Sequence, residues 1–338
     1  MSQISKPTLI DPEEKVFDIK DEPMPHGAWW WWFWLFFFNN PKNPEKPRQL
    51  MILWSIKNVK EVDCNYLKIK ADNTGDRDIL DGVVAVWYYD GDKMHHNYLL
   101  ERCKLNIEDN KLTTDSKTPT SFSINKDTNT IKIGDKFKFI AKTDSNNPLD
   151  KTTYNSDIYL ANKGYSIIRT NHLKLGGKVE DTPIDGSAYF QRVFVNAPSV
   201  PWYWGIFHFE NKAMLSYFNP YLLGKSLKGN VAFYDGNKNH TLSKMKIKKT
   251  GGKETPTFKV TAENTDEKIS FTVNAYAHSS WTFKGKPLGI IPTKLIYNEY
   301  PATISELKLE NKKTGETITQ EDLGKAVGNA EHTTGVLL

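Results

Sequence analysis

A block of consecutive aromatic residues near the start of the chain sets the strongest limit on its fold. The stretch from His26 to Asn40 reads HGAWWWWFWLFFFNN, and it holds five of the ten tryptophans of the chain. A surface strand normally alternates apolar and polar residues, because one face meets the core and the other meets water. This stretch is aromatic on both faces, so both faces need cover from other parts of the protein.

The aromatic block is too short to cross a membrane as a helix. It ends at NNP, residues 39–41, after about eleven residues, whereas a membrane-spanning helix needs roughly 20 apolar residues. Tryptophan also prefers membrane interfaces to the membrane centre. Residues 1–23 contain no apolar segment typical of a signal peptide. We therefore expect no stable membrane span and a cytoplasmic protein.

The charge of the chain gives no indication of a nucleic-acid partner. There are 45 basic and 40 acidic residues, for a formal charge of +5, and the lysines are scattered along the sequence. Binding to nucleic acid requires a concentrated basic surface. Apolar residues make up only 38% of the chain and aromatic residues 12%, so we expect aromatic rings to supply much of the core.

The two cysteines, Cys64 and Cys103, are too few for a disulfide framework. We expect two buried free thiols, with a single disulfide as the alternative. The sequence shows no metal-ligand cluster at a usual spacing, and no motif for phosphate binding, dinucleotide binding or serine hydrolysis. Any chemistry is therefore expected to proceed without a metal or a cofactor.

An alternation of period two runs through almost the whole chain and predicts an all-β protein. Turn sequences such as YYDGDK, LGGK and KTGGK separate the alternating segments, as in an antiparallel sandwich or barrel. A single short helical turn is expected near residues 319–324. The segments that we expect to form strands are 29–38, 66–70, 83–89, 130–141, 187–195, 202–217, 228–234, 257–262, 269–276 and 304–309.

The chain divides into two halves, each of which begins with a tryptophan-rich strand. Pro198 and Pro201 mark the joint, and we predict an extension at 1–24, a first barrel at 25–197 and a second at 198–338. Even and odd residues of the aromatic block lie on opposite faces of a strand. If one set fills a barrel, a second barrel is the simplest cover for the other. Which set faces inward depends on register, so both choices remain open.

The second tryptophan-rich segment, APSVPWYWGIFHFENKAMLSYF at 197–218, extends this interpretation. With the first block, it resembles the two-domain, lipocalin-like superfamily that includes carotenoid 1,2-hydratases (hydroxyneurosporene synthases) and AttH-type proteins. A group of decalin-forming Diels–Alderases shares that fold. AWWWW at 28–32 resembles the early Glu-Trp-Trp-Tyr-like strand of the family, and the segment from Trp204-Gly205 to Tyr217 resembles its middle motif.

Two late segments, YNEYPA at 297–302 and GNAEHTTG at 328–335, resemble the C-terminal strands and the final glutamate-bearing loop of the same family. The sequence also departs from the pattern. Ala28 stands at the position of the early glutamate, and Trp202 stands where the hydratases carry a histidine. The resemblance implies two tandem lipocalin-like antiparallel β-barrels packed through aromatic strands, more than it implies one reaction.

Three side chains are candidates for a catalytic acid. His208 shares one face of its strand with Trp202 and Trp204, and an acid among aromatic rings is what protonation of an alkene requires. Glu299 shares a face with Tyr297 if its segment is extended, and Glu331 completes the set. The alternatives are a histidine at a strand end, a glutamate paired with lysine at the rim, and a Glu331–His332 pair of which one member faces water.

The candidate ligand-binding residues are mostly aromatic, because rings can line a cavity for an apolar molecule. His26 is a candidate for the entrance of the cavity, and the alternative is a histidine that only forms a turn. For the rings, the alternative is that they only pack the contact between the two barrels. The full set is His26, Trp30, Trp32, Trp34, Trp202, Trp204, Tyr297 and His332.

These observations favour capture of a hydrophobic, isoprenoid or polyene-like small molecule in an aromatic cavity. The predicted reaction is cofactor-free alkene hydration, isomerisation or cyclisation. A lipid or terpenoid carrier is the first alternative, since it needs the cavity without the acid. A structural protein with a filled core is the second.

Overall fold

The computed structural model describes residues 7–19, 24–59, 61–70, 79–159, 163–197, 199–285 and 292–336, and antiparallel strands make up most of them. The strands of the first sheet are β1 (Thr8–Leu9), β2 (Trp29–Phe38), β3 (Arg48–Lys57), β6 (Ile79–Tyr89), β7 (Met94–Glu108), β8 (Lys111–Thr114), β9 (Thr120–Asn125), β10 (Thr128–Ile133), β11 (Phe137–Lys142), β12 (Thr152–Tyr159), β13 (Lys163–Val179), β14 (Thr182–Pro183) and β15 (Gly186–Asn196).

The second sheet draws most of its strands from the other half of the chain. Its strands are β4 (Val62–Cys64), β5 (Leu67–Ile69), β16 (Trp202–Phe209), β17 (Met214–Leu222), β18 (Lys225–Ser226), β19 (Asn230–Tyr234), β20 (Asn239–Thr250), β21 (Thr257–Glu263), β22 (Glu267–Ala275), β23 (Ser279–Gly285), β24 (Thr293–Asn311), β25 (Thr317–Thr319) and β26 (Ala326–Val336).

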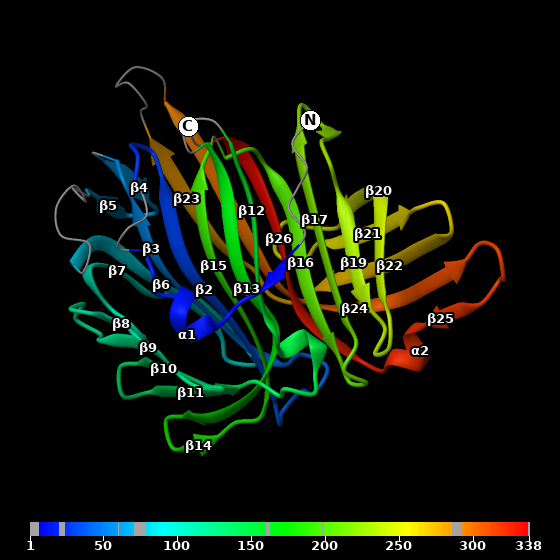
Figure 1. Ribbon diagram of the computed structural model, residues 1–338, viewed down its shortest axis with the longest axis horizontal. Coiled ribbons are helices and arrows are strands. Elements are labelled where there is room, and N and C mark those ends of the chain that lie inside the picture. The colour runs from blue at the N-terminus through cyan, green and yellow to red at the C-terminus, as the bar shows by residue number, and fades with distance from the viewer. Residues whose placement is uncertain are drawn as a thin grey trace.

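Each sheet closes into a barrel, and the two barrels lie side by side (Figure 1). Ten strands form the first, in the order β13-β11-β10-β9-β8-β7-β6-β3-β2-β15, and pairing of β15 with β13 completes the ring. Eight strands form the second, in the order β22-β21-β20-β19-β17-β16-β26-β24, and pairing of β24 with β22 completes it. The predicted all-β, two-barrel fold is confirmed.

The division along the chain is not a simple cut. The last strand of the first ring ends at Asn196 and the first strand of the second ring begins at Trp202. The hairpin of β4 and β5, however, leaves the first half and pairs with β23 of the second sheet, with Cys64 opposite Phe283. Pro198, named above as part of the joint, lies outside the described residues.

Two segments that the sequence predicts as single strands are hairpins in the structure. The expected strand 130–141 is the hairpin of β10 and β11, which turns at Gly134 with φ +52°. The expected strand 202–217 is the hairpin of β16 and β17. In both, apolar alternation continues on either side of a tight turn, so periodicity alone does not reveal the break.

Three short helical segments occur among the residues that the structure describes. They are α1 (Pro12–Lys15), the 3-10 turn η1 (Pro148–Asp150) and α2 (Gln320–Leu323). The turn expected near residues 319–324 is confirmed as α2, at whose start the carboxylate of Asp322 accepts a hydrogen bond from the backbone of Thr319 at 2.8 Å. No helix in the described part of the chain has the length and apolar character needed to cross a bilayer.

The two faces of β2 meet different partners, which settles the open choice of parity. The even residues, from Trp30 to Phe38, lie in the core of the first barrel. The odd residues Phe33, Leu35 and Phe37 lie in a separate cluster that also holds Ile206, Met214 and Trp281 of the second barrel. We call this layer between the barrels the seam. The hypothesis that a second barrel covers the other face of the aromatic strand is confirmed.

The segment before β2 packs against the first barrel. Val16, Phe17 and Ile19 are buried in its core, and the Phe17 ring lies 4.9 Å from the Phe122 ring. The indole Nε1 of Trp32 donates a hydrogen bond to the carbonyl of Val16 at 2.8 Å. The part of the predicted extension that the structure describes therefore contributes to the barrel core.

Candidate active site in the seam between the barrels

Two glutamates lie directly opposite each other on neighbouring strands of the second barrel. Glu299 of β24 pairs in register with Glu331 of β26. The residues next to them, Tyr300 and Ala330, fill the core of the second barrel. Because side chains alternate along a strand, both carboxyl groups point out of that barrel and into the seam. Glu299 is fully buried and Glu331 is 4% exposed.

Glu299 is held by one residue from each barrel. Its Oε2 accepts hydrogen bonds from the indole Nε1 of Trp87 at 3.0 Å and from the amide of Asn329 at 3.2 Å. Trp87 belongs to β6 of the first barrel, so the first of these bonds crosses the seam. Its other oxygen has no hydrogen-bond partner among the described residues. Burial, and then repulsion from Glu331, raises the pKa of Glu299 well above its usual value.

Glu331 accepts a hydrogen bond at each of its oxygens. The indole Nε1 of Trp202 donates to Oε2 at 2.9 Å, and the hydroxyl of Tyr297 donates to Oε1. Burial raises the pKa of Glu331 to about 7, and the two hydrogen bonds limit the rise because they stabilise the carboxylate. Both carboxyl groups therefore hold their protons to higher pH than an exposed glutamate does, and Glu331 gains and loses its proton near neutrality.

Aromatic rings surround the carboxyl pair, and several remain partly exposed. The ring of Trp202 lies 5.7 Å from that of Tyr297, and both side chains are half-buried. Trp204, also half-buried, lies opposite Glu331 in the β16–β26 pairing. Its ring is 5.5 Å from the ring of Tyr189 of the first barrel. A proton donor thus lies beside rings that solvent reaches.

His208 occupies a different part of the seam. It lies four residues beyond Trp204 on β16, which is about 13 Å along a strand. Its Nε2 donates to the carbonyl of Asn171 at 2.8 Å, so its Nδ1 accepts from the hydroxyl of Ser187 at 2.7 Å. Burial, and then the nearby His172, lowers the pKa of His208 to about 3. The imidazole is therefore neutral at neutral pH and joins the two barrels.

The two remaining candidate histidines are apart from the carboxyl pair. His26 is exposed in the turn before β2. His332 points to the opposite face from Glu331, into the second barrel, where its ring stacks on Tyr203 at 4.2 Å. Burial lowers its pKa to about 4. The alternative that Glu331 or His332 faces water is wrong, since both are buried, and so is the alternative that Glu299 pairs with lysine.

The indoles of Trp30, Trp32 and Trp34 are also separate from the carboxyl pair. All three are buried in the core of the first barrel. The Trp34 ring packs at 5.5 Å on Phe36, at 5.1 Å on Phe122 and at 4.7 Å on Phe190. Other side chains of this barrel thus fill the space around them.

Sequence reasoning missed Trp87 and Asn329. Asn329 precedes Glu331 by two residues, so alternation offered a signal that the two share a face. The segment 328–335 resembles a loop of the family in sequence, whereas the structure shows it within strand β26. Trp87 is 212 residues from Glu299 along the chain, and nothing in the sequence indicates their contact.

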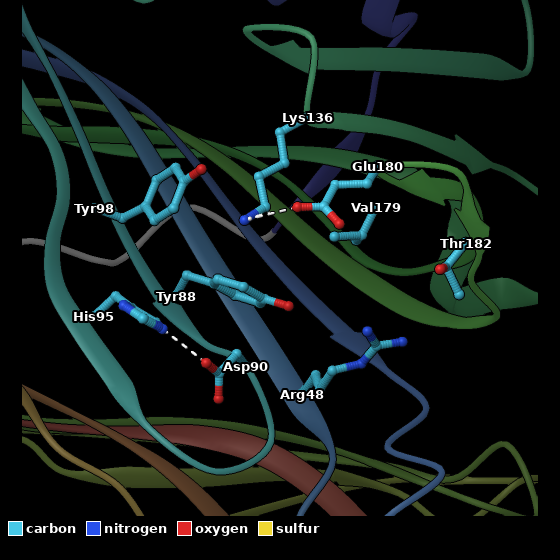
Figure 2. A pocket seen from close by; sticks show the side chains of 9 residues that line it. All are labelled: Arg48, Tyr88, Asp90, His95, Tyr98, Lys136, Val179, Glu180 and Thr182. Carbon is cyan, nitrogen blue, oxygen red and sulfur yellow. Dashed lines mark hydrogen bonds and ion pairs between the residues drawn. The ribbon is translucent and has the colours of Figure 1, made fainter.

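A cavity of about 270 Å³ lies apart from the seam, at one end of the first barrel (Figure 2). Its charged side chains are largely paired with each other. Lys136 Nζ lies 3.1 Å from Glu180 Oε1, and His95 Nε2 lies 2.7 Å from Asp90 Oδ2. Hydrogen bonds from Lys93, His95 and Asp92 oppose the effect of burial and lower the pKa of Asp90. Asp90 is therefore ionised at neutral pH.

The described residues contain no group of three or more His, Cys, Asp or Glu side chains arranged to hold a metal ion. Both cysteines are buried free thiols, as expected, and burial raises the pKa of each to about 12.

No family model matches the sequence, and no curated protein sequence matches it. Solved structures do match. An AttH-type protein of Nitrosomonas europaea superposes with a TM-score of 0.53 at 9% identity over 98% of each chain. CghA superposes with a TM-score of 0.51 at 9% identity, over 99% of this chain and 94% of its own. Kievitone hydratase from Nectria haematococca has a TM-score of 0.45 at 9% identity, over 98% and 96%. The predicted resemblance is confirmed for the fold: the chain has the two-barrel architecture of the AttH-type protein and CghA.

Proposed function

We propose that the protein binds a hydrophobic, unsaturated small molecule at the seam and catalyses a cofactor-free reaction that begins with protonation of a carbon–carbon double bond. The observation that carries this proposal is the buried pair of opposed carboxyl groups, Glu299 and Glu331, beside partly exposed aromatic rings. A lone buried carboxylate would be unfavourable, and a buried pair without cations retains a proton.

Glu331 is the proposed proton donor. An efficient general acid has a pKa near the working pH, and the pKa of Glu331 is raised to about 7. The proton moves from its carboxyl oxygen to one alkene carbon, and the neighbouring carbon becomes a cation. The carboxylate left behind keeps its hydrogen bonds from Trp202 and Tyr297. The raised pKa of Glu299 favours retention of a proton on this second carboxyl group when Glu331 loses its own.

The rings around Glu331 suit a cationic intermediate. Aromatic faces attract cations, most strongly where water is excluded. Trp202, Trp204 and Tyr297 supply these faces. Addition of water to the cation, with return of one proton to the carboxylate of Glu331, would give hydration. Loss of a different proton to that carboxylate would give isomerisation. Attack by a second double bond, followed by loss of a proton from the new cation to the carboxylate, would give cyclisation. None of these reactions oxidises or reduces the substrate overall, so no oxidant or reductant is needed.

The roles expected of His208 and of the three inner indoles change within this proposal. A neutral His208 with both ring nitrogens engaged is a poor proton donor, so we leave it out of the acid group. The three inner indoles, Trp30, Trp32 and Trp34, are assigned to packing of the first barrel. The proposed ligand contacts are Trp202, Trp204 and Tyr297.

The test begins with the ligand itself. The protein is purified from an isoprenoid-producing strain, and an organic extract is analysed by mass spectrometry. The recovered molecule is then incubated in D₂O with the wild type and with Glu331→Gln. We expect carbon-bound deuterium in the wild-type product and its loss in the variant.

Glu310→Gln is the matched control, because Glu310 lies on the same strand as Glu299 with a side chain 44% exposed, 3.1 Å from Lys308. It should leave deuterium incorporation intact. A bound molecule that is recovered unchanged and free of deuterium would support the carrier function instead. Deuterium incorporation that survives Glu331→Gln would show that another group donates the proton.

A further inference from the structure

An arginine on the wall of the first barrel faces the same seam. Arg169 lies on β13, opposite Gln191 of β15. The preceding residue, Ile168, is buried in the core of the first barrel, so Arg169 points out of that barrel. Two residues further along β13, the carbonyl of Asn171 accepts the hydrogen bond from His208. Arg169 is therefore on the part of the wall that adjoins β16.

The guanidinium of Arg169 has no ion-pair partner among the described residues, and its Nε is buried without a hydrogen bond. By contrast, Arg48 donates its Nε to the carbonyl of Asn39 at 2.7 Å. A buried donor on a charged group is unfavourable unless it is paired. Gln191 adds a second donor, because its side-chain oxygen accepts from Tyr189 at 2.9 Å and leaves the amide nitrogen available.

The arginine and the carboxyl pair flank the same aromatic residues. Tyr189 lies two residues from Gln191 on β15, and its ring is 5.5 Å from that of Trp204. Trp204 in turn lies opposite Glu331. Burial raises the pKa of Tyr189; the charge of Arg169 opposes this rise and that of Glu331 adds to it. Both charges therefore act on one hydroxyl at the centre of this part of the seam.

We propose that Arg169, with the amide of Gln191, binds an anionic oxygen group of the ligand, such as a carboxylate. The apolar part of the molecule then extends over Trp204 toward Glu331. This inference rests on the proposed function and deepens it, since it assigns the substrate to the amphipathic, unsaturated acids rather than to neutral hydrocarbons. Arginine suits the role because its planar guanidinium binds a carboxylate through two parallel hydrogen bonds.

The test compares a carboxylic acid with its uncharged methyl ester. cis-Parinaric acid is a conjugated polyene acid, and its methyl ester lacks the negative charge. Each is titrated into the full-length protein while tryptophan fluorescence is followed. We expect the wild type to bind the acid about tenfold or more tightly than the ester. Arg169→Gln should remove that preference and leave ester affinity within about twofold. Arg169→Lys should keep part of it.

Arg102→Gln is the control, since Arg102 is an exposed arginine of the first barrel on β7. It should leave the preference intact, and Trp204→Ala should weaken both probes together. Equal wild-type affinity for acid and ester, or a preference that survives Arg169→Gln, would overturn the inference. The deuterium test with Glu331→Gln is independent of these titrations, so failure of the arginine assignment is distinguishable from failure of the proposed function.

Discussion

The two faces of β2 carry nearly the same kinds of residue and meet different surroundings. On the inner face, the indoles of Trp32 and Trp34 are fully buried among the side chains of their own barrel. On the outer face, Trp29 and Trp31 are half-buried, and the Phe33 ring lies 6.4 Å from the Trp204 ring of the second barrel.

The two faces therefore differ in role: the inner rings contribute to stability, and the outer rings adjoin the candidate active site. Inner rings pack mainly on other rings and aliphatic side chains of their own barrel, and the guanidinium of Arg192 lies 4.6 Å from the Trp30 ring. Outer rings share the seam with the wall of the second barrel, which carries Glu299 and Glu331. Aromatic residues become part of a candidate active site where a proton donor and solvent access accompany them.

Replacement of one ring in the core of the first barrel and of one ring in the seam should give the largest contrast in stability. Trp32→Ala removes a fully buried indole and its hydrogen bond to Val16, and should lower the free energy of unfolding by about 3–5 kcal/mol. Trp204→Ala removes a half-buried indole and should cost about 1–2 kcal/mol. Urea unfolding followed by far-UV circular dichroism measures both. Equal losses would remove the distinction between barrel core and seam.

Glu331→Gln should affect turnover far more than folding. It preserves shape and removes the proposed proton donor, so turnover of a confirmed substrate should fall about 10²–10⁴-fold. The free energy of unfolding should hold or rise at neutral pH, since a buried ionisable group becomes a neutral amide. Single-turnover kinetics and urea unfolding of the same preparation provide the measurements. A large loss of stability with little loss of turnover would assign Glu331 a structural role.

The carboxyl pair should make the protein less stable as pH rises. Glu331 has a pKa of about 7 in the folded protein against a reference value of 4.5, so the folded state binds its proton more tightly between those values. The free energy of unfolding should therefore fall by about 3 kcal/mol from about pH 4.5 to about pH 7 through this group. The pKa of Glu299 is raised as well, so this group adds to the fall in the same direction.

The double variant Glu299→Gln, Glu331→Gln supplies the comparison for this slope. Urea unfolding at about pH 5 and about pH 8 should show a smaller loss in the variant than in the wild type. Equal losses in the two proteins would mean that the pair is not protonated in the folded state. Turnover should also decline above about pH 7, where Glu331 loses its proton.

Alternation along the chain predicted the fold class because it depends only on local geometry. It correctly placed Trp202, Trp204 and His208 on one face of β16, which is the face toward the seam. It did not reveal the turn at Gly134 or the hairpin of β16 and β17, since the apolar pattern continues through both.

The pairing of Glu299 with Glu331 was beyond the reach of local pattern. Both residues were identified as acids, but their contact depends on the register between β24 and β26. The bond from Trp87 depends in addition on how the barrels pack. Arg169 gave no signal either, because a lone arginine in a strand looks like a surface residue until its neighbours are known.

The far end of the seam offers the smallest and most specific test. The hydroxyl of Ser187 donates to Nδ1 of His208, a neutral imidazole buried between the barrels. Ser187→Ala leaves that nitrogen without a donor and should lower the free energy of unfolding by about 1–2 kcal/mol. Turnover should be unchanged, since this contact lies four residues along β16 from Trp204. A turnover loss as large as that of Glu331→Gln would bring His208 back into the chemistry and extend the active site along the whole seam.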